Sequence, residues 1–368
     1  MNIPFLDLHA QYLSIKEDID KAIADTIKNS AYIKSPSVTD FENQFAEFLG
    51  AAHVVACGNG TDAIEILLTA MGIGKGDEVL VPAMSWISTS ETVATTGATP
   101  VFVDIRRDTY VIDERLIADK VSSRTKAIIP VHLYGCPANM PVIMDLAQKH
   151  HIKVIEDCAQ AHGAEICGKK IGTFGHAATF SFFPTKNLGA YGDAGAIVTN
   201  DVELANEARS ISNHGQRERH THTLDGRNSR MDGMQAAILS VKLKHLERWT
   251  KERIRKAKIY SSILKDISEI QVPTKPENIK HVYHLYVIKL KPREALRDYL
   301  SNQGISTLVH YPKSLPFQPC YDYQKNMESD FPVAAQVQDS VLSLPLYPEL
   351  EDETIVHIAQ TLKNFKGS

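Results

Sequence analysis

The chain has 368 residues, of which 43% are hydrophobic and 23% are charged, and its formal net charge is −4. This length allows one large α/β core and a smaller second one. The weak negative charge gives no electrostatic reason to expect nucleic acid or an acidic membrane surface as a partner. No apolar run reaches the ~20 residues that a membrane-spanning helix needs. The start, MNIPFLDLHAQ, lacks the basic and apolar parts of a secretory signal.

The five cysteines are scattered and form no CxxC pair: Cys57, Cys136, Cys158, Cys167 and Cys320. An odd and sparse set is typical of reduced thiols rather than of a disulfide framework or a zinc site. We therefore expect a cytoplasmic protein without a bound metal.

The first 50 residues are predicted to be helical. Ser14 and Glu17 have capping-box spacing ahead of three isoleucines on one face. A second helix carries several phenylalanines and stops at Gly50, a residue that commonly ends helices.

Short β-rich runs then recur along the chain, at 53–57, 78–82, 100–105, 126–134, 153–157, 178–183 and 196–200. Helical stretches, at 61–71 and 141–150, lie between some of them. Strands that alternate with helices predict a mostly parallel sheet covered by helices on both faces. In such sheets, ligands bind at the carboxyl ends of the strands.

From about residue 236 the pattern changes to one long helix that reaches residue 264, followed by a mixture of strands, helix and proline-rich loops. We expect a large α/β domain over 1–245 and a smaller C-terminal domain over 246–368. Residues 242–258 hold eight Lys or Arg against two Glu. A nucleic-acid stripe is one interpretation of this run, but a solvated helix face opposite the apolar positions is favoured.

The segment VACGNGTDAIEILL contains Gly58, Gly60 and Ala63 and so matches G-x-G-x-x-A between a strand and a helix. A dinucleotide site, and with it an NAD-dependent oxidoreductase, is therefore an alternative. That fingerprint needs an acidic residue at the far end of the next strand. Asp77 and Glu78 have the right separation, but they precede the strand and would lie at the wrong edge of the sheet.

A phosphate cradle is the favoured interpretation of this glycine loop. The backbone N–H groups of Gly60, Thr61 and Asp62 would face the phosphate at a helix N-terminus, with the Thr61 hydroxyl beside them. A helix that is merely capped by Thr61 is the structural alternative, and the motif alone is weak.

Two strand ends deliver a carboxylate and an amine to one rim. Asp157 ends a nearly continuous apolar strand, and Lys186 follows the next strand, five residues after Ser181. Pyridoxal 5′-phosphate (PLP) needs this set: a lysine for its aldehyde, an acidic residue that keeps its ring nitrogen protonated, and donors for its phosphate. Trp86, which follows the second strand, could pack on the ring; a core tryptophan is the alternative.

The chain resembles the PLP-dependent nucleotide-sugar aminotransferases of the DegT/DnrJ/EryC1/StrS family, which have the aspartate-aminotransferase fold (PLP fold type I). The resemblance runs over nearly the whole chain, in the segments IPFLDLHAQY, GNGTDAI, GDEVLVPAMSWISTSETV, VIEDCAQAHGA, FSFFPTKNLGAYGDAGAIVTND, NSRMDGMQAAIL and VHYP. So many blocks in the same order make it specific.

The resemblance implies a role for each matching residue. Lys186 would form the Schiff base and Asp157 would pair with the pyridine nitrogen, while Gln160 would bond the 3′-oxygen and Trp86 would stack on the ring. Gly60, Thr61 and Ser181 would hold the phosphate. The family forms homodimers with shared sites, so Asn228 would reach the partner's phosphate. Arg230, His310 and Tyr311 would line the substrate pocket.

The resemblance also implies the reaction. An amino group would pass from L-glutamate to a keto-sugar nucleotide, because a lysine stands where some relatives that act as dehydratases carry histidine. The NSR segment is more similar to enzymes that aminate C3 than C4, and WbpE-like sugar 3-aminotransferases with UDP-linked 3-keto substrates look closest. A role in surface polysaccharide (lipopolysaccharide or O-antigen) synthesis would follow. The alternatives are a dTDP-3-keto-6-deoxyhexose 3-aminotransferase, a sugar 4-aminotransferase and a non-catalytic regulatory relative.

Overall fold

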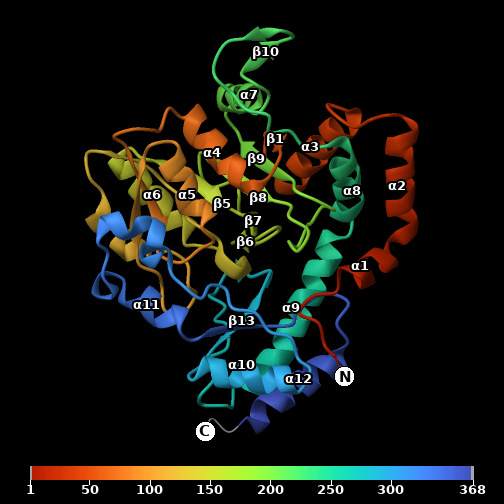
Figure 1. Ribbon diagram of the computed structural model, residues 1–368, viewed down its shortest axis with the longest axis vertical. Coiled ribbons are helices and arrows are strands. Elements are labelled where there is room, and N and C mark those ends of the chain that lie inside the picture. The colour runs from red at the N-terminus through yellow and green to blue at the C-terminus, as the bar shows by residue number, and fades with distance from the viewer. Residues whose placement is uncertain (1, 366–368) are drawn as a thin grey trace.

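The computed structural model describes residues 2–365 and has a seven-stranded sheet at its centre, with the order β1-β9-β8-β5-β4-β2-β3 (Figure 1). β9 runs antiparallel to both of its neighbours, and the other neighbouring strands are parallel. The predicted α/β architecture with a mostly parallel sheet is therefore confirmed. Its strands are β1 His53–Cys57, β2 Glu78–Pro82, β3 Thr99–Val103, β4 Thr125–Ile128, β5 Lys153–Asp157, β8 Ala177–Ser181 and β9 Gly195–Thr199.

Helices flank the sheet on two sides (Figure 1). α4 Gly60–Ala70 packs against α5 Ser88–Thr95, α8 Gly233–Leu243 packs against α2 Lys16–Lys28 and α3 Pro36–Leu49, and α6 Met140–His150 packs against β5. α3 ends as expected, because Gly50 adopts φ 76°, which costs little without a side chain. The predicted capping box is wrong: Ser14 is the last residue of α1 (Leu8–Ser14), and its hydroxyl donates to the Gln11 carbonyl.

The predicted long helix is two helices. α8 ends at Leu243 and α9 (Leu246–Leu264) begins after His245. α9 runs from the large body into the lower, smaller part of the molecule, where it packs against α12 Asp352–Asn364 (Figure 1). The basic run is not wholly solvated, because Lys242, Arg253 and Lys256 are buried.

The smaller part has its own apolar core around Tyr260, Tyr286 and Ile358. A two-stranded antiparallel sheet lies at its centre, formed by β13 Tyr286–Lys289 and β14 Val341–Leu344, with α10 Arg293–Asn302 beside it. We propose the domain division at 245/246, where the helix breaks. The division is not complete in three dimensions, since α11 (Pro332–Gln338) packs on the large core.

The remaining elements are short. α7 Val202–Ile211 leads to a hairpin that projects from the body at the top of Figure 1. Its strands are β10 Gln216–Glu218 and β11 Thr221–His222, and a separate small sheet contains β6 Glu165–Ile166, β7 Lys169–Lys170 and β12 Ile279–Lys280. Within residues 2–365, no helix has the length and apolarity needed to cross a membrane.

Candidate active site

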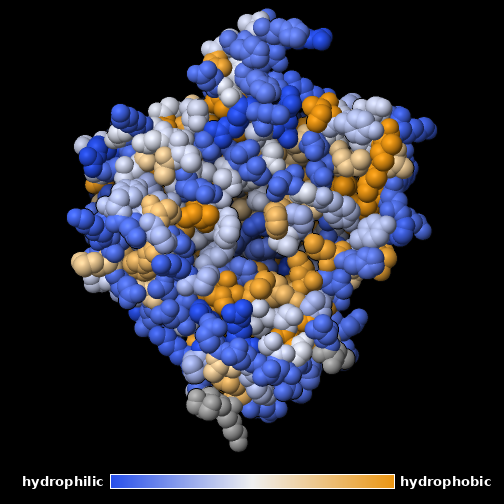
Figure 2. Space-filling view, in the orientation of Figure 1, coloured by the Kyte–Doolittle hydropathy of each residue, from blue (hydrophilic) through white to orange (hydrophobic). Residues whose placement is uncertain are grey.

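The carboxyl edge of the sheet gathers the predicted site. Asp157 is the last residue of β5 and Ser181 the last residue of β8, two neighbouring parallel strands. Gly195 begins the antiparallel β9 at the same edge, where it pairs with both Ser181 and Cys57. The glycine loop, Lys186 and Asp157 therefore all leave the sheet at one rim. Figure 2 shows apolar atoms gathered near the middle of the visible face, between the large body and the smaller part.

Asp157 is buried, and each of its carboxylate oxygens has a fixed donor. The Thr89 hydroxyl donates to Oδ2 at 3.0 Å, and the Ala159 N–H donates to Oδ1 at 3.1 Å. Burial raises the pKa of this carboxyl group, while the two hydrogen bonds and the nearby Lys186 charge favour its ionised form. A carboxylate so placed can pair with a cationic partner at the rim.

Lys186 lies in the loop between β8 and β9 and is partly buried. Burial lowers the pKa of its amine to about 8, and the Asp157 carboxylate opposes part of that effect. A substantial fraction of the amine is therefore neutral near pH 7.5. A neutral amine is the form that attacks an aldehyde or accepts a proton.

The glycine loop makes a tight contact with the end of β8. A Cβ built on Gly60 would lie 2.7 Å from the Ser181 Cβ, so no larger residue fits there. Asn59, not Thr61, caps α4: its side chain accepts from the Asp62 N–H at 2.8 Å. Of the three predicted phosphate donors, the Asp62 N–H is thus occupied, while those of Gly60 and Thr61 belong to the first turn and have no intrahelical partner. The Thr61 hydroxyl bonds Ser88 at 2.7 Å.

Gln160 and Tyr311 connect the two parts of the molecule. The Gln160 amide donates to the Tyr311 hydroxyl at 2.9 Å and accepts from the Tyr134 N–H at 2.7 Å. The Tyr311 ring lies 5.7 Å from that of Trp86, which is 58% exposed. The alternative of a core tryptophan is therefore wrong, and the Trp86 face is open at the rim.

His310 lies beside this aromatic pair. Its Nδ1 bonds the Ser343 hydroxyl at 2.8 Å, and its ring is 5.6 Å from Tyr311. Burial lowers the pKa of His310 to about 4, and the positive charge of Lys186 adds to the effect. His310 is thus a neutral imidazole at physiological pH.

Asn228 and Arg230 lie on either side of Ser229, whose hydroxyl contacts Gly58 of the glycine loop. Asn228 is exposed, and its backbone forms an isolated bridge with Asn213. Arg230 donates to the Asn213 side chain at 3.2 Å, and its buried Nε has no partner within residues 2–365. Within residues 2–365, Arg230 forms no ion pair with an acidic side chain, and its one side-chain hydrogen bond is the one to Asn213.

The sequence analysis did not identify four residues around this rim: Thr89, Ser229, His284 and Asn187. Thr89 holds Asp157, and the buried Ser229 hydroxyl accepts from the Gly58 N–H at 3.1 Å. The buried His284 bonds Asn187, the neighbour of Lys186, at 3.1 Å. Thr89 and Ser229 lie next to recognised motifs and could have been found there. His284 is distant in the sequence, and no local pattern marks it.

Two other features do not form competing sites. Glu78, the acidic residue of the dinucleotide alternative, begins β2 at the opposite edge and bonds Arg124 and Ser122, so this fingerprint is incomplete. His132, Glu156 and Cys158 cluster within 4.8 Å. However, Glu156 already accepts three backbone N–H groups and faces the His132 ring, so these atoms are engaged within the protein.

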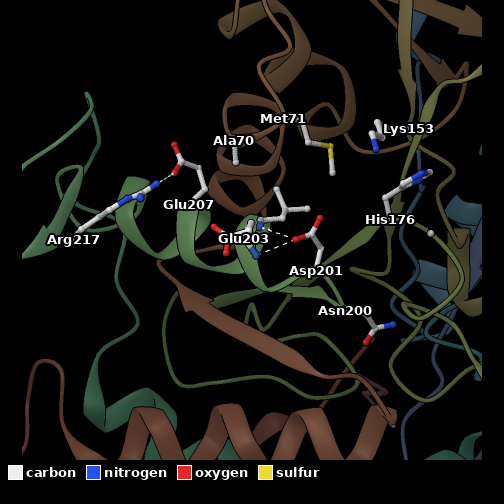
Figure 3. A pocket seen from close by; sticks show the side chains of 11 residues that line it. Ala70, Met71, Lys153, His176, Asn200, Asp201, Glu203, Glu207 and Arg217 are labelled. Atoms are coloured by element: carbon white, nitrogen blue, oxygen red, sulfur yellow. Dashed lines mark hydrogen bonds and ion pairs between the residues drawn. The ribbon is translucent and has the colours of Figure 1, made fainter.

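A surface pocket of about 610 Å³ lies at the far edge of the sheet (Figure 3). Lys153, which lines it, begins β5, whereas Asp157 ends that strand. Figure 3 shows the ion pair of Glu207 with Arg217 and the bonds of Asp201 to the first turn of α7. The pocket lies at the opposite end of β5 from Asp157 and is therefore separate from the rim described above.

The rim fits PLP on three observations. A buried acid stands opposite a lysine with a lowered pKa, the glycine loop passes too close to Ser181 for any Cβ, and first-turn N–H groups of α4 are open to an anion. Fold and site together define a PLP-dependent enzyme of the aminotransferase type.

The sequence profile of the DegT/DnrJ/EryC1/StrS aminotransferase family matches residues 13–363, and the chain belongs to this family. Curated relatives include a "Pleiotropic regulatory protein" of Geobacillus stearothermophilus, 44% identical over 99% of both chains. A UDP-2-acetamido-2-deoxy-3-oxo-D-glucuronate aminotransferase of Pseudomonas aeruginosa is 42% identical over 98% of this chain and 100% of the relative. A dTDP-3-amino-3,6-dideoxy-alpha-D-galactopyranose transaminase of Aneurinibacillus thermoaerophilus is 41% identical over 99% of both.

Solved structures agree with this assignment. DesV of S. venezuelae, in complex with ketimine intermediate, has a TM-score of 0.96 at 39% identity and covers 98% of both chains. NtdA of Bacillus subtilis, with bound cofactor PMP, has a TM-score of 0.88 at 31% identity and covers 98% of this chain and 85% of the other. The protein is therefore a PLP-dependent sugar-nucleotide aminotransferase.

Proposed function

We propose that the protein transfers the amino group of L-glutamate to C3 of a UDP-linked 3-keto N-acetylhexosamine or uronic acid derivative. The observation that carries the chemistry is the pairing of buried Asp157 with Lys186 at adjacent strand ends. The NSR segment supports the C3 position. So do the names of two relatives, one of which refers to a 3-oxo sugar and the other to a 3-amino sugar. The uridine nucleotide rests on the first of those two, and a dTDP-linked 6-deoxyhexose is the second candidate.

PLP, when bound, supplies an aldehyde and an electron-accepting ring. Asp157, supported by Thr89 and Ala159, would keep a proton at the ring nitrogen. Lys186 would hold the cofactor through its side-chain amine, and the neutral amine, once free, would move the proton that glutamate gives up at its α-carbon. The same amine moves the proton back when the keto sugar occupies the site, so the reaction has two half-reactions and ping-pong kinetics.

The remaining rim residues position the reactants. Gly60, Thr61 and Ser181 would hold the phosphate of the cofactor, and Asp62 would support them through the cap of α4. Trp86 would stack on the ring, and Gln160, which now bonds Tyr311, would bond the 3′-oxygen. His310 and Tyr311 line the substrate side.

We further propose a homodimer in which Asn228 binds the partner's phosphate and Arg230 an anionic group of the partner's substrate. The exposed Asn228, the unpartnered Nε of Arg230 and the projecting hairpin support this arrangement. We place the enzyme in the cytoplasm, in the synthesis of amino sugars for a surface polysaccharide.

A reverse-direction screen tests the substrate. The purified holoenzyme is incubated with 2-oxoglutarate and a panel of UDP- and dTDP-linked 3-amino and 4-amino sugars, and glutamate formation is measured. We expect turnover of a UDP-linked 3-amino sugar. Turnover of 4-amino sugars alone contradicts the C3 assignment. Turnover of dTDP-linked sugars alone contradicts the uridine nucleotide and favours the second candidate, a dTDP-linked 6-deoxyhexose. A Lys186→Ala variant is the control and should form no glutamate. If glutamate causes no change in the cofactor absorbance of the wild-type protein, the non-catalytic regulatory alternative is favoured.

A further inference from the structure

The buried lysine of α8 is not explained by the proposed chemistry. Lys242 is 1% exposed, yet it forms no ion pair with an acid of residues 2–365, and Glu349 is the one acid whose charge acts on it. Burial lowers the pKa of Lys242 to about 8, so most of the amine is still an ammonium group near pH 7.5. Burial of an unpaired ammonium group is costly, and an apolar side chain of similar length could fill the same volume. The contacts of Lys242 should therefore explain why a lysine is buried at this position.

Both contacts of Lys242 lie in the loop that carries the catalytic lysine, residues 186–193, which we call the lysine loop. The Lys242 Nζ donates to the Gly189 carbonyl at 2.8 Å and lies 4.2 Å from the centre of the Tyr191 ring. A charged hydrogen bond and a desolvated cation–π contact are both among the stronger polar interactions in proteins. These two interactions attach the lysine loop to α8.

A second residue of α8 holds the same loop. Gln235 accepts from the Tyr191 N–H at 2.8 Å, and a Cβ built on Gly192 would lie 3.0 Å from its Nε2. α8 itself packs against α2 and α3, which fix its position in the large body. On the other side, a Cβ on Gly189 would come within 2.3 Å of the Pro184 carbonyl. The loop is thus confined between α8 and the residues just before it, Phe183 and Pro184.

We propose that Lys242 is a positioning residue for catalysis, which fixes the lysine loop so that the Lys186 amine meets the substrate α-carbon in one geometry. The inference rests on the proposed function of Lys186, but the fixing of the loop stands apart from any substrate. It acts through the loop backbone, because the charge of Lys242 is not among those that shift Lys186. A small displacement of a reacting group costs rate far more than it costs binding.

The test compares Lys242→Met with Lys244→Met, an exposed lysine two residues further on. In the holoenzyme, Lys242→Met should slow the glutamate half-reaction at least tenfold, measured by stopped-flow cofactor absorbance, with KM changed less than about twofold. The unfolding temperature should stay within about 3 °C of wild type, because removal of a buried charge offsets the lost hydrogen bond. Lys244→Met should behave as wild type.

A second measurement needs no cofactor or substrate. Hydrogen exchange of the cofactor-free protein should show faster exchange in the lysine loop of Lys242→Met and no change elsewhere. Tyr191→Leu removes the contact of this ring with Lys242 and its edge contact with Tyr12, but it leaves the Gly189 hydrogen bond. It should give an intermediate rate and intermediate loop exchange, and it replaces Lys242→Met should that variant not fold. Unchanged loop exchange, or a rate loss that follows a general fall in stability, overturns the proposal. If the wild-type protein is inactive and the lysine loop still exchanges faster in Lys242→Met, the proposed function is contradicted and the role of Lys242 in fixing the loop is supported.

Discussion

The Lys186 amine acts as nucleophile and base only in its neutral form, and burial favours that form. Its pKa is lowered to about 8, so the fraction of free amine rises through the range from pH 7 to pH 9. In the cofactor-free protein we expect acylation of Lys186 by a water-soluble reagent to be half-maximal near pH 8, followed by peptide mass spectrometry. Asp157→Asn should move this midpoint to lower pH, since the carboxylate opposes the shift. A midpoint above pH 10 contradicts the burial of the amine.

Thr89 determines how well Asp157 stays ionised. Its hydroxyl donates to Oδ2 and also bonds Ser85 at 2.8 Å, so a short chain of hydroxyls supports the carboxylate. Thr89→Val keeps the shape and removes one donor, which raises the pKa of Asp157 further and should weaken the proposed bond of Asp157 to the pyridine nitrogen. We expect PLP affinity, measured by fluorescence titration, to fall about tenfold. Thr89→Ser retains the hydroxyl and should remain near wild type; equal losses in both variants would point to packing rather than to the hydrogen bond.

At the scale of elements, the contact between the glycine loop and β8 leaves no room for a side chain. Gly60→Ala places a methyl group 2.7 Å from the Ser181 Cβ, so the start of α4 or the end of β8 must move. We expect a loss of about 1–3 kcal/mol in the free energy of unfolding, measured with urea, and much weaker cofactor binding.

The matched control removes the obstacle instead of the methyl group. In Gly60→Ala/Ser181→Gly the contact is relieved, so stability should recover relative to Gly60→Ala, and the two substitutions should not be additive. PLP affinity should stay low in the double variant, because the Ser181 hydroxyl is gone. Additive stability effects would show that the close approach is not the cause.

The strands, and the helices between them, could be predicted from sequence because each contains its own pattern. Apolar runs that end in Asp157 and before Lys186 place both residues at a strand end without any knowledge of their contacts. The break at Lys244 and His245 could not be predicted, because apolar positions continue through it and no glycine or proline marks it. The burial of Lys242 was missed for a related reason: a basic run looks solvated until the loop that covers it is known.

The site residues were predictable only where they lie in local motifs. Asp157, Lys186 and the glycine loop meet because parallel strands share one carboxyl edge, which the strand pattern already implies. Gln160 and Tyr311 are 151 residues apart and meet only through the docking of the smaller part. The resemblance to a known family, rather than residue patterns, suggested that His310 and Tyr311 line the pocket.

At the scale of the whole molecule, a shared site can be tested by mixing subunits. Asn228 is exposed on its own chain, so its proposed phosphate contact needs a second copy. Lys186→Ala and Asn228→Ala homodimers should each be nearly inactive. If each site takes Lys186 from one chain and Asn228 from the other, a mixed dimer contains one site with both defects and one intact site.

Random re-association of equal amounts should therefore restore about a quarter of the wild-type activity, since half of the dimers are mixed and half of their sites are intact. The variants are unfolded and refolded together, and the rate with glutamate and the sugar substrate is compared with that of a refolded wild type. A mixture of Lys186→Ala with Asp157→Ala is the control, because both residues lie at the same sheet edge of one chain and no intact site can form. No recovery with Asn228→Ala would place Asn228 in the site of its own chain.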